Sequence, residues 1–166
     1  MSFSLIPKML CPSLTDLTPE RLQNAGVTFL MLDFDNTIVP YTTDVPTPEM
    51  EAWLARMQCS EIGLCVVSNS HKSRVVEFCS ARGIPCITYA RKPFSKGILQ
   101  CRDKFSLDLS HAALAGDQIY TDVLGANCAG AVSILVRPIH LHTIWLRLRH
   151  VAELPFIFIG KRSAKL

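Results

Sequence analysis

Two aspartates, Asp33 and Asp35, stand two positions apart in the segment MLDFDNTIVP (residues 31–40), directly after an apolar run. An ionised carboxylate that is buried without partners costs several kcal/mol, so an ordinary buried strand seldom ends in two of them. Carboxylates in such a place serve as nucleophiles, as proton donors and acceptors, or as metal ligands. The pair marks a candidate reactive site, and such a site needs partners elsewhere in the chain.

Further polar residues follow the later apolar runs of the sequence. They are Ser68 and Asn69, then Lys92, then Asp117 and, five positions on, Asp122. If the apolar runs are parallel strands, their carboxyl ends meet at one edge of a sheet, where ligands of such sheets bind. We therefore expect these side chains to lie near Asp33 and Asp35.

The apolar runs have the form of buried parallel strands separated by helices of about ten residues. The expected strands are 26–34, 62–70, 84–90, 111–117 and 131–138, and the third, being more polar, is expected near an edge. The expected helices are 47–58, 72–83, 95–106 and 120–130. This alternation predicts an α/β fold with a doubly wound, Rossmann-like parallel sheet. The pattern does not decide whether residues before 25 pack on this core.

The chemistry that suits these residues is phosphoryl transfer. Three converging carboxylates repel one another unless a hard cation lies among them, and oxygen ligands of this kind suit Mg²⁺. Asp33 is the candidate nucleophile, forming an aspartyl-phosphate, and Asp35 is the candidate acid that protonates the leaving oxygen and then activates water. Lys92 and the cation would neutralise charge on the phosphoryl group, and Ser68 and Thr37 can donate hydrogen bonds to it.

Four segments, DFDNT, VVSNS, RKP and GDQIYTD, resemble in order and spacing the four motifs of the haloacid dehalogenase (HAD) superfamily of phosphatases. The resemblance implies that Asp33 is the nucleophile and a Mg²⁺ ligand, and that Asp35 is the acid and base, with its backbone carbonyl on the metal. It further implies that Asp117 is the remaining direct metal ligand and that Asp122 acts through a water or orients the site. Ser68 and Asn69 would bind phosphoryl oxygens, and Lys92 would be the lysine of the third motif.

Some of these residues also have ordinary structural explanations. Asp122 would suit the first turn of a helix, where a negative charge is stabilising. Thr37 could cap the turn after the first strand, and Asn36 is read mainly as a turn former. For Asp33 and Asp35 no such explanation is at hand.

The spaces between the motifs are short. Many HAD proteins carry a cap domain in one of them, but residues 38–67 and 70–91 have room only for a helix and a strand each. A site without a cap stays open, and it suits a phosphate presented on a membrane, a polymer or a protein. Some capless relatives nevertheless act on small sugar phosphates.

Composition is that of a globular chain of 166 residues, 49% hydrophobic, with a formal net charge of +3. Its seven cysteines form no C-x-x-C pair and are interpreted as reduced, mostly buried thiols of a cytosol-like compartment. No signal peptide is evident at the N-terminus, and no apolar run reaches the roughly 18 residues of a membrane-spanning helix.

The C-terminal segment is basic. Residues 137–166 hold six lysines and arginines against the single acid Glu153. Apolar residues at 141, 144, 145, 148, 151 and 152 form a helical stripe, with His142, Arg147, Arg149 and His150 opposite. Such a helix suits an anionic lipid interface, but the stripe equally suits packing on the sheet, and the two can coexist. We therefore divide the chain into a core with an N-terminal extension (1–138) and a basic amphipathic segment (139–166).

More closely, the chain resembles the capless YqeG-type group of HAD phosphatases, with LIPKML, DLTPERL and GDQIYTDVLGAN as shared marks. Members of this group, including mitochondrial and plastid relatives, are linked to the conversion of phosphatidylglycerophosphate to phosphatidylglycerol. The resemblance implies an anionic phospholipid substrate and a peripheral membrane protein of the cytoplasmic or organelle-matrix side, with no nucleic acid as partner. Two alternatives stay open: a phosphatase for a soluble sugar phosphate or a nucleic-acid end, and a non-catalytic binding or assembly protein. The oligomeric state is not predicted.

Overall fold

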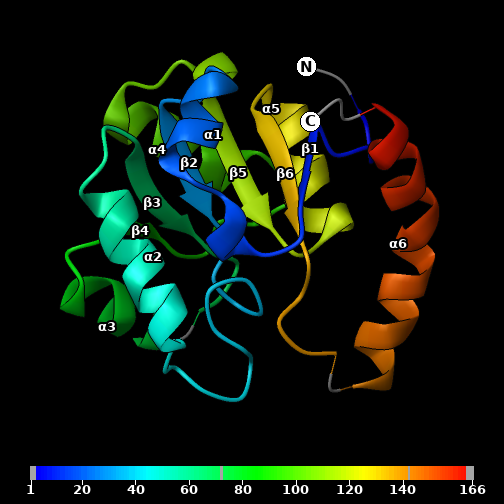
Figure 1. Cartoon of the computed structure of the whole chain (residues 1–166), viewed down its shortest axis with the longest axis horizontal. Coiled ribbons are helices and arrows are strands. Elements are labelled where there is room, and N and C mark those ends of the chain that lie inside the picture. The colour runs from blue at the N-terminus through cyan, green and yellow to red at the C-terminus, as the bar shows by residue number, and fades with distance from the viewer. Residues whose placement is uncertain (1–2, 72, 142, 164–166) are drawn as a thin grey trace.

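A sheet of six parallel strands forms the centre of the computed structural model, which describes residues 3–71, 73–141 and 143–163, without the side chains at 145, 150, 162 and 163. The strand order is β1-β6-β5-β2-β3-β4 (Figure 1). The strands are β1 (Met9–Cys11), β2 (Phe29–Leu32), β3 (Gly63–Val67), β4 (Cys86–Ile87), β5 (Ala112–Gly116) and β6 (Val132–Val136). The predicted α/β fold with a parallel sheet is confirmed, and the third predicted strand, β4, lies at the edge as expected.

Strand β1 was not predicted from the sequence. It has three residues, and it pairs with β6 with Met9 opposite Ile134 and Cys11 opposite Val136. The backbone N–H of Lys8 extends the pairing by donating to the carbonyl of Ser133. A strand this short has too few residues to show a period, so only its pairing partner identifies it. The described part of the segment before residue 25 thus contributes a strand to the sheet.

Helices cover both faces of the sheet. They are α1 (Pro19–Asn24), α2 (Pro48–Gln58), α3 (Ser73–Ala81), α4 (Lys96–Phe105), α5 (Leu124–Ala129) and α6 (Ile144–Ser163). Leu30 and Leu32 of β2 lie in one buried cluster with side chains of α1, α2 and α3. Met31, which points to the other face, lies in a second cluster with side chains of α4 and α5. This alternation explains why β2 is buried along its whole length.

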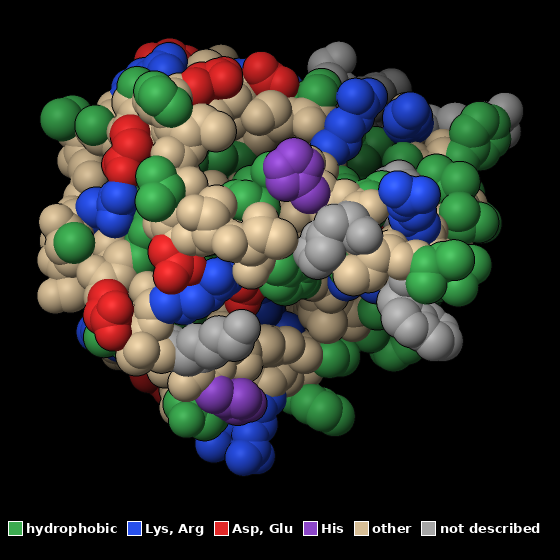
Figure 2. Space-filling view, turned by 90° about the horizontal axis from the view of Figure 1, so that it is seen from below, with side chains coloured by type: hydrophobic (Ala, Val, Ile, Leu, Met, Phe, Trp, Pro, Cys, Tyr) green, Lys and Arg blue, Asp and Glu red, His purple; other side chains and the backbone are tan. Residues whose placement is uncertain are grey.

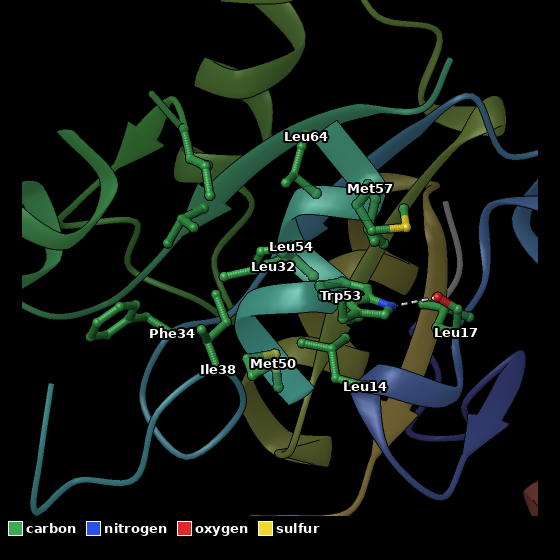
Figure 3. Close-up of a cluster of buried hydrophobic side chains, with 14 of the residues drawn as sticks. Leu14, Leu17, Leu32, Phe34, Ile38, Met50, Trp53, Leu54, Met57 and Leu64 are labelled. Atoms are coloured by element: carbon green, nitrogen blue, oxygen red, sulfur yellow. Dashed lines mark hydrogen bonds between the residues drawn. The ribbon is translucent and has the colours of Figure 1, made fainter. Parts of the chain in front are cut away.

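Helix α2 shows how the local sequence places a covering helix. Thr47 caps it by accepting a hydrogen bond from the N–H of Met50, and Pro48 occupies the first turn, where no N–H is needed. Trp53 is fully buried against the sheet, and its indole N–H donates to the carbonyl of Leu17 at 2.7 Å (Figure 3). That bond ties the N-terminal segment to the core.

Connections at the carboxyl edge of the sheet are short. A single helix, α2, joins β2 to β3, and α3 joins β3 to β4. The described residues therefore contain no cap domain, as the spacing of the motifs predicted. The carboxyl ends of β2, β3 and β5 lie uncovered by any inserted domain.

Helix α6 stands beside β1 at one side of the molecule (Figure 1). Phe156 and Ile157 pack on a cluster formed by Ile119, Val123 and Leu135, and Gly160 approaches Pro7 closely. The predicted stripe does not pack: Ile144, Leu148 and Val151 are 70%, 55% and 60% exposed. Of the two alternatives left open for this stripe, packing on the sheet does not hold for these three residues, because Glu153, Phe156, Ile157 and Gly160 form a second helical stripe that faces the core.

Two further points concern α6. His142 and the side chains of Trp145 and His150, which the sequence placed on the amphipathic helix, lie outside the described residues. Among the residues that are described, no helix is both long and apolar enough to cross a membrane.

Candidate active site

A buried lysine holds the first aspartate of the site. Asp33 follows β2, and its backbone N–H donates to the carbonyl of Ala115 on β5. Lys92 Nζ lies 2.6 Å from Asp33 Oδ1 and 2.7 Å from Asp122 Oδ1, and all three residues are buried. The lysine of the third predicted motif thus contacts an aspartate of the first motif and an aspartate of the fourth.

Three carboxylates converge at this edge, and two of them, Asp33 and Asp117, follow strands as predicted. One oxygen each of Asp33, Asp117 and Asp122 lies within 4.8 Å of the other two. Asp122 reaches the cluster because Ile119–Val123 form a π-helical turn that directs its side chain back over Gly116. A Cβ at residue 116 would lie 2.3 Å from Asp122 Oδ2, so this approach requires glycine.

The electrostatics are those of crowded, buried acids. Burial raises the pKa of Asp33 to about 6, with Lys92 opposing the rise and Asp122 adding to it. Burial raises the pKa of Asp117 to about 7, and the charges of Asp33 and Asp122 add to this. Burial alone would lower the pKa of Lys92, but Asp122 and Asp33 outweigh it and the pKa is raised. The single positive charge of Lys92 therefore neutralises the negative charges of the three acids only in part.

The donor set of this cluster fits a divalent cation. Asp117 Oδ1 is buried and makes no hydrogen bond to any described residue. An unpartnered carboxylate oxygen inside a protein is costly, and a hard cation shared by three carboxylates removes that cost. Asp33, Asp117 and Asp122 are the residues that would hold it. Asp122 belongs to this donor set, although the sequence reading assigned it an indirect role, and Asp35, which was predicted to bind the metal through its backbone carbonyl, contributes no carboxylate to the set.

Asp35 has a partner that sequence reasoning missed. Arg74, the second residue of α3, forms an ion pair with Asp35 and another with Asp44. The side chain of Asp35 is 20% exposed, and it lines the same small cavity as Asp33. Arg74 is 39 residues from Asp35 in sequence, and nothing in its own segment indicates a role in the site.

Asn36 and Thr37, the two residues that follow Asp35, connect this loop to the acids of the cluster. Asn36 adopts a positive φ of 65°, as a turn former can, and is fully buried. Its amide Nδ2 donates to Asp117 Oδ2 at 3.1 Å, and its Oδ1 accepts from the N–H of His140. Thr37 Oγ1 lies 3.5 Å from Asp33 Oδ2. Asn36 therefore does more than turn the chain, because it orients an acid of the cluster.

Ser68 and Asn69 lie where phosphate binding was predicted, on the wall of a cavity of about 90 Å³ with Asp33 and Lys92. Ser68 Oγ accepts from the N–H of Ser70 and keeps its own proton available. Asn69 is engaged differently: its amide donates to the carbonyl of Lys92 and accepts from the N–H of the same residue. The contact that the structure shows for Asn69 is with the backbone that carries the lysine.

The C-terminal helix also reaches the site, which the sequence did not indicate. Arg149 Nη2 lies 3.2 Å from Asp117 Oδ2. Glu153, one turn later, is buried and accepts a hydrogen bond from the N–H of Ile119. Arg149, which the sequence placed opposite the apolar stripe, thus faces the acids, because the stripe itself is turned outward.

Comparisons with known proteins agree with this architecture. A family model described as "HAD-hyrolase-like" matches residues 89–138. "Probable phosphatase YqeG" from Bacillus subtilis (strain 168) is 34% identical over 134 residues, which cover 81% of this chain and 78% of that protein.

Solved structures share the fold at low sequence identity. An uncharacterised protein from Listeria monocytogenes serotype 4b superposes with a TM-score of 0.55 at 15% identity, over 80% of this chain and 99% of its own. The cobalt-bound deoxy-D-mannose-octulosonate 8-phosphate phosphatase (YrbI) from Haemophilus influenzae gives a TM-score of 0.54 at 9% identity, over 84% and 92%.

Proposed function

The chain belongs to the capless YqeG-type group of HAD phosphatases, as its motifs predicted, and on that premise we propose that it hydrolyses phosphatidylglycerophosphate to phosphatidylglycerol. The observation that carries the chemistry is the buried Asp33, held 2.6 Å from Lys92 beside two further acids and opening on a small polar cavity. That cavity suits a single phosphoryl group.

In the proposed reaction an oxygen of Asp33 attacks phosphorus, and the bond from phosphorus to the ester oxygen breaks. Asp35 gives its proton to the departing alcohol. Asp35 then takes a proton from water, whose oxygen attacks the aspartyl-phosphate and releases phosphate and the Asp33 carboxylate. Lys92 keeps Asp33 ionised near neutral pH against burial, which otherwise raises its pKa. Ser68 and Thr37 donate to the phosphoryl oxygens, and Arg74 positions Asp35.

Mg²⁺ is the cation that we propose for the cluster of Asp33, Asp117 and Asp122. When bound, it would neutralise charge on the acids and on the phosphoryl group. The choice rests on the donors, which are all carboxylate oxygens and suit a hard cation. The Haemophilus structure is described as cobalt-bound, so other divalent ions belong in the test.

A peripheral position on an anionic membrane of the cytoplasmic or organelle-matrix side is part of the proposal. The site has no cap, so a phosphate on a lipid headgroup can approach it directly. The outer face of α6, which we define as Ile144, Leu148 and Val151, exposes three large apolar side chains beside the exposed Arg147. Apolar side chains with an adjacent cation suit an anionic lipid interface. In this proposal residues 139–166 are the membrane-facing segment.

A phosphatase for a soluble sugar phosphate is the second candidate. It is favoured by the fold shared with the Haemophilus enzyme, which is named as an octulosonate 8-phosphate phosphatase. A non-catalytic binding protein is a weaker candidate, because it would have no need of Asp33, Lys92, Asp117 and Asp122 together.

Phosphate release separates these candidates. The purified chain is assayed with Mg²⁺ on phosphatidylglycerophosphate in detergent micelles and, in parallel, on octulosonate 8-phosphate and glycerol 3-phosphate. We expect the lipid to be the best substrate by kcat/KM, and Asp33→Asn and chelation to abolish release. Better turnover of the sugar phosphate would select the second candidate. No release from any substrate, with Asp33→Asn indistinguishable from the parent, would leave the binding protein.

A further inference from the structure

An apolar groove lies between α6 and the edge of the sheet formed by β1 and β6. Its volume is about 630 Å³, several times that of the cavity at Asp33. Apolar side chains from three parts of the chain make up most of its wall: Leu10 and Pro12, then Leu135, Val136 and Pro138, then Leu141, Leu154 and Ile157. Pockets of about 300–1,000 Å³ with such walls are typical of sites for organic ligands.

This groove borders the acidic cluster at Asp117. Asp117 lines the groove, and one of its oxygens lies within 4.8 Å of ligand oxygens of Asp33 and Asp122. Arg149 contacts Asp117 from the side of α6. The groove and the cavity at Asp33 have different lining residues, and they adjoin through the cluster to which both Asp117 and Asp33 belong.

The charged members of the groove wall are two cations, Arg137 and Lys161, and two acids, Asp117 and Glu153. Both acids already have partners, since Asp117 contacts Arg149 and Asn36 and Glu153 accepts from the N–H of Ile119, whereas no contact of this kind occupies Arg137 or Lys161 among the described residues. In Figure 2, which views the molecule from below, hydrophobic and basic side chains are interspersed on the side where α6 lies. The groove thus combines an apolar wall with positive charge, which complements an anionic amphiphile.

We infer that this groove binds one acyl chain of the phospholipid substrate, an inference that rests on the proposed function. The lipid carries a phosphomonoester, then a phosphodiester, then hydrocarbon, and the protein offers the acidic cluster, then arginines, then apolar side chains in the same order. The phosphomonoester lies at Asp33, the phosphodiester lies near Arg149 and Arg137, and the hydrocarbon lies along Leu154 and Ile157.

An alkyl chain suits this wall better than a peptide does. Peptide N–H and C=O groups lying against leucine, isoleucine and valine side chains would lose their hydrogen bonds to water without finding new ones. An alkyl chain carries no such groups, and each methylene that leaves water contributes about 0.8 kcal/mol. The wall therefore selects for hydrocarbon, and its cations select for the lipid's phosphates.

A binding experiment tests the groove without catalysis. Dihexanoyl-phosphatidylglycerol, kept below its micelle concentration, is titrated into the full chain by calorimetry, with glycerol 3-phosphate as the headgroup control. We expect the short-chain lipid to bind at least about tenfold more tightly than glycerol 3-phosphate. Leu154→Trp, which places an indole in the groove, should weaken lipid binding by about tenfold or more.

Matched variants make the result specific. Ile159 is on the same helix and is 43% exposed against 47% for Leu154, but it does not line the groove, so Ile159→Trp should leave lipid affinity within about twofold. Leu141→Trp fills the groove from another segment and should repeat the effect of Leu154→Trp. Circular dichroism establishes that each variant is folded.

The outcomes separate the groove from the proposed function. Equal effects of Leu154→Trp and Ile159→Trp, or no preference for the lipid over glycerol 3-phosphate, would overturn the groove even if phosphate is released from phosphatidylglycerophosphate. Lipid binding that is lost in Leu154→Trp and Leu141→Trp alone would support the groove even if no phosphate is released. In the latter case the proposed function would fail and the groove would stand.

Discussion

The acidic cluster and the outer face of α6 depart from ordinary burial in opposite ways. At the carboxyl edge of the sheet, Asp33, Lys92, Asp117 and Asp122 place charges in the interior, each less than a tenth exposed. On α6, Ile144, Leu148 and Val151 place large apolar side chains at the surface, each more than half exposed. Buried charges and exposed apolar patches are the two arrangements that stability by itself does not favour.

The two regions are stabilised in different ways. The buried charges are fixed by partners, since Lys92, Asn36 and Arg149 each contact an acid of the cluster. The exposed apolar residues have no such requirement, because the opposite stripe of the same helix carries the packing. Changes in the first region should therefore affect both activity and stability, whereas changes in the second should affect binding to lipid.

The largest effect is expected from Asp33→Asn. The variant keeps the shape of the side chain but loses the nucleophile, so kcat should fall by about a thousandfold or more. Phosphate release under saturating substrate measures this. Asp103→Asn, at an exposed acid of α4, is the control and should retain parental kcat. Substantial activity in Asp33→Asn would remove the first region from the chemistry.

Lys92→Met should give the largest loss of stability. It leaves Asp33 and Asp122 buried without their cation, and breaking such a pair costs about 3–5 kcal/mol. Urea denaturation without divalent ions measures the free energy of unfolding. Lys96→Met, at an exposed lysine only four residues away, should change it by less than about 0.5 kcal/mol. Similar values for the two variants would contradict the assigned role of the buried ion pair.

Stability of the metal-free protein should depend on pH through the acids. Folding raises the pKa of Asp33 from 3.8 to about 6 and that of Asp117 from 3.8 to about 7. Both carboxyls bind protons more tightly in the folded state than in the unfolded state. Their contribution to the free energy of unfolding is therefore fully present below pH 3.8 and is lost as the pH rises to about 7. Melting temperatures across this range, compared with those of Asp117→Asn, isolate the effect, which the variant should reduce.

Addition of Mg²⁺ should reverse this loss near pH 7. A ligand that binds only the folded state stabilises it by about 2.7 kcal/mol at a concentration of 100 times Kd. Thermal unfolding with and without Mg²⁺ measures the gain. Asp117→Asn should show little or none of it, and an equal gain in the variant would exclude Asp117 as a ligand.

Arg149→Ala should have an intermediate effect, because Arg149 joins the two regions. Its removal leaves Asp117 and Glu153 without a cation nearby, and we expect a loss of about 1–3 kcal/mol in the free energy of unfolding. Arg147→Ala, on the exposed side of the helix, should lose less than about 0.5 kcal/mol. Equal losses would mean that the contact with Asp117 contributes nothing to stability.

The smallest change in stability is expected on the outer face of α6. Replacing Ile144, Leu148 and Val151 together by serine should alter stability by no more than about 0.5 kcal/mol for each residue. Co-sedimentation with vesicles containing phosphatidylglycerol should nevertheless fall, because about 1.5 kcal/mol or more of apolar burial is lost for each side chain. Val76→Ser, at an exposed valine of α3, should leave co-sedimentation at the parental level. Unchanged co-sedimentation of the triple variant would remove the lipid role of this face.

The fold and the acids of the site were predictable because both depend on local patterns. An apolar run followed by a carboxylate identifies a strand end, and strand ends of a parallel sheet meet at one edge. Asp33, Lys92 and Asp117 come together for that reason, whereas Asp122 joins them through the π-helical turn Ile119–Val123. Strand β1 was not predictable, since three residues carry no period and its partner is more than a hundred residues away.

The sequence by itself determined the parallel sheet, the short connections between the motifs, and the placing of Asp33, Lys92 and Asp117 after strands, because each follows from neighbouring residues. Only the tertiary structure decided which face of α6 turns inward and which residues meet the acids from elsewhere. Arg74 reaches Asp35 across 39 residues, and Arg149 reaches Asp117 across 32. Such contacts depend on how a packed helix is rotated, and a helix with two apolar stripes does not determine its own rotation.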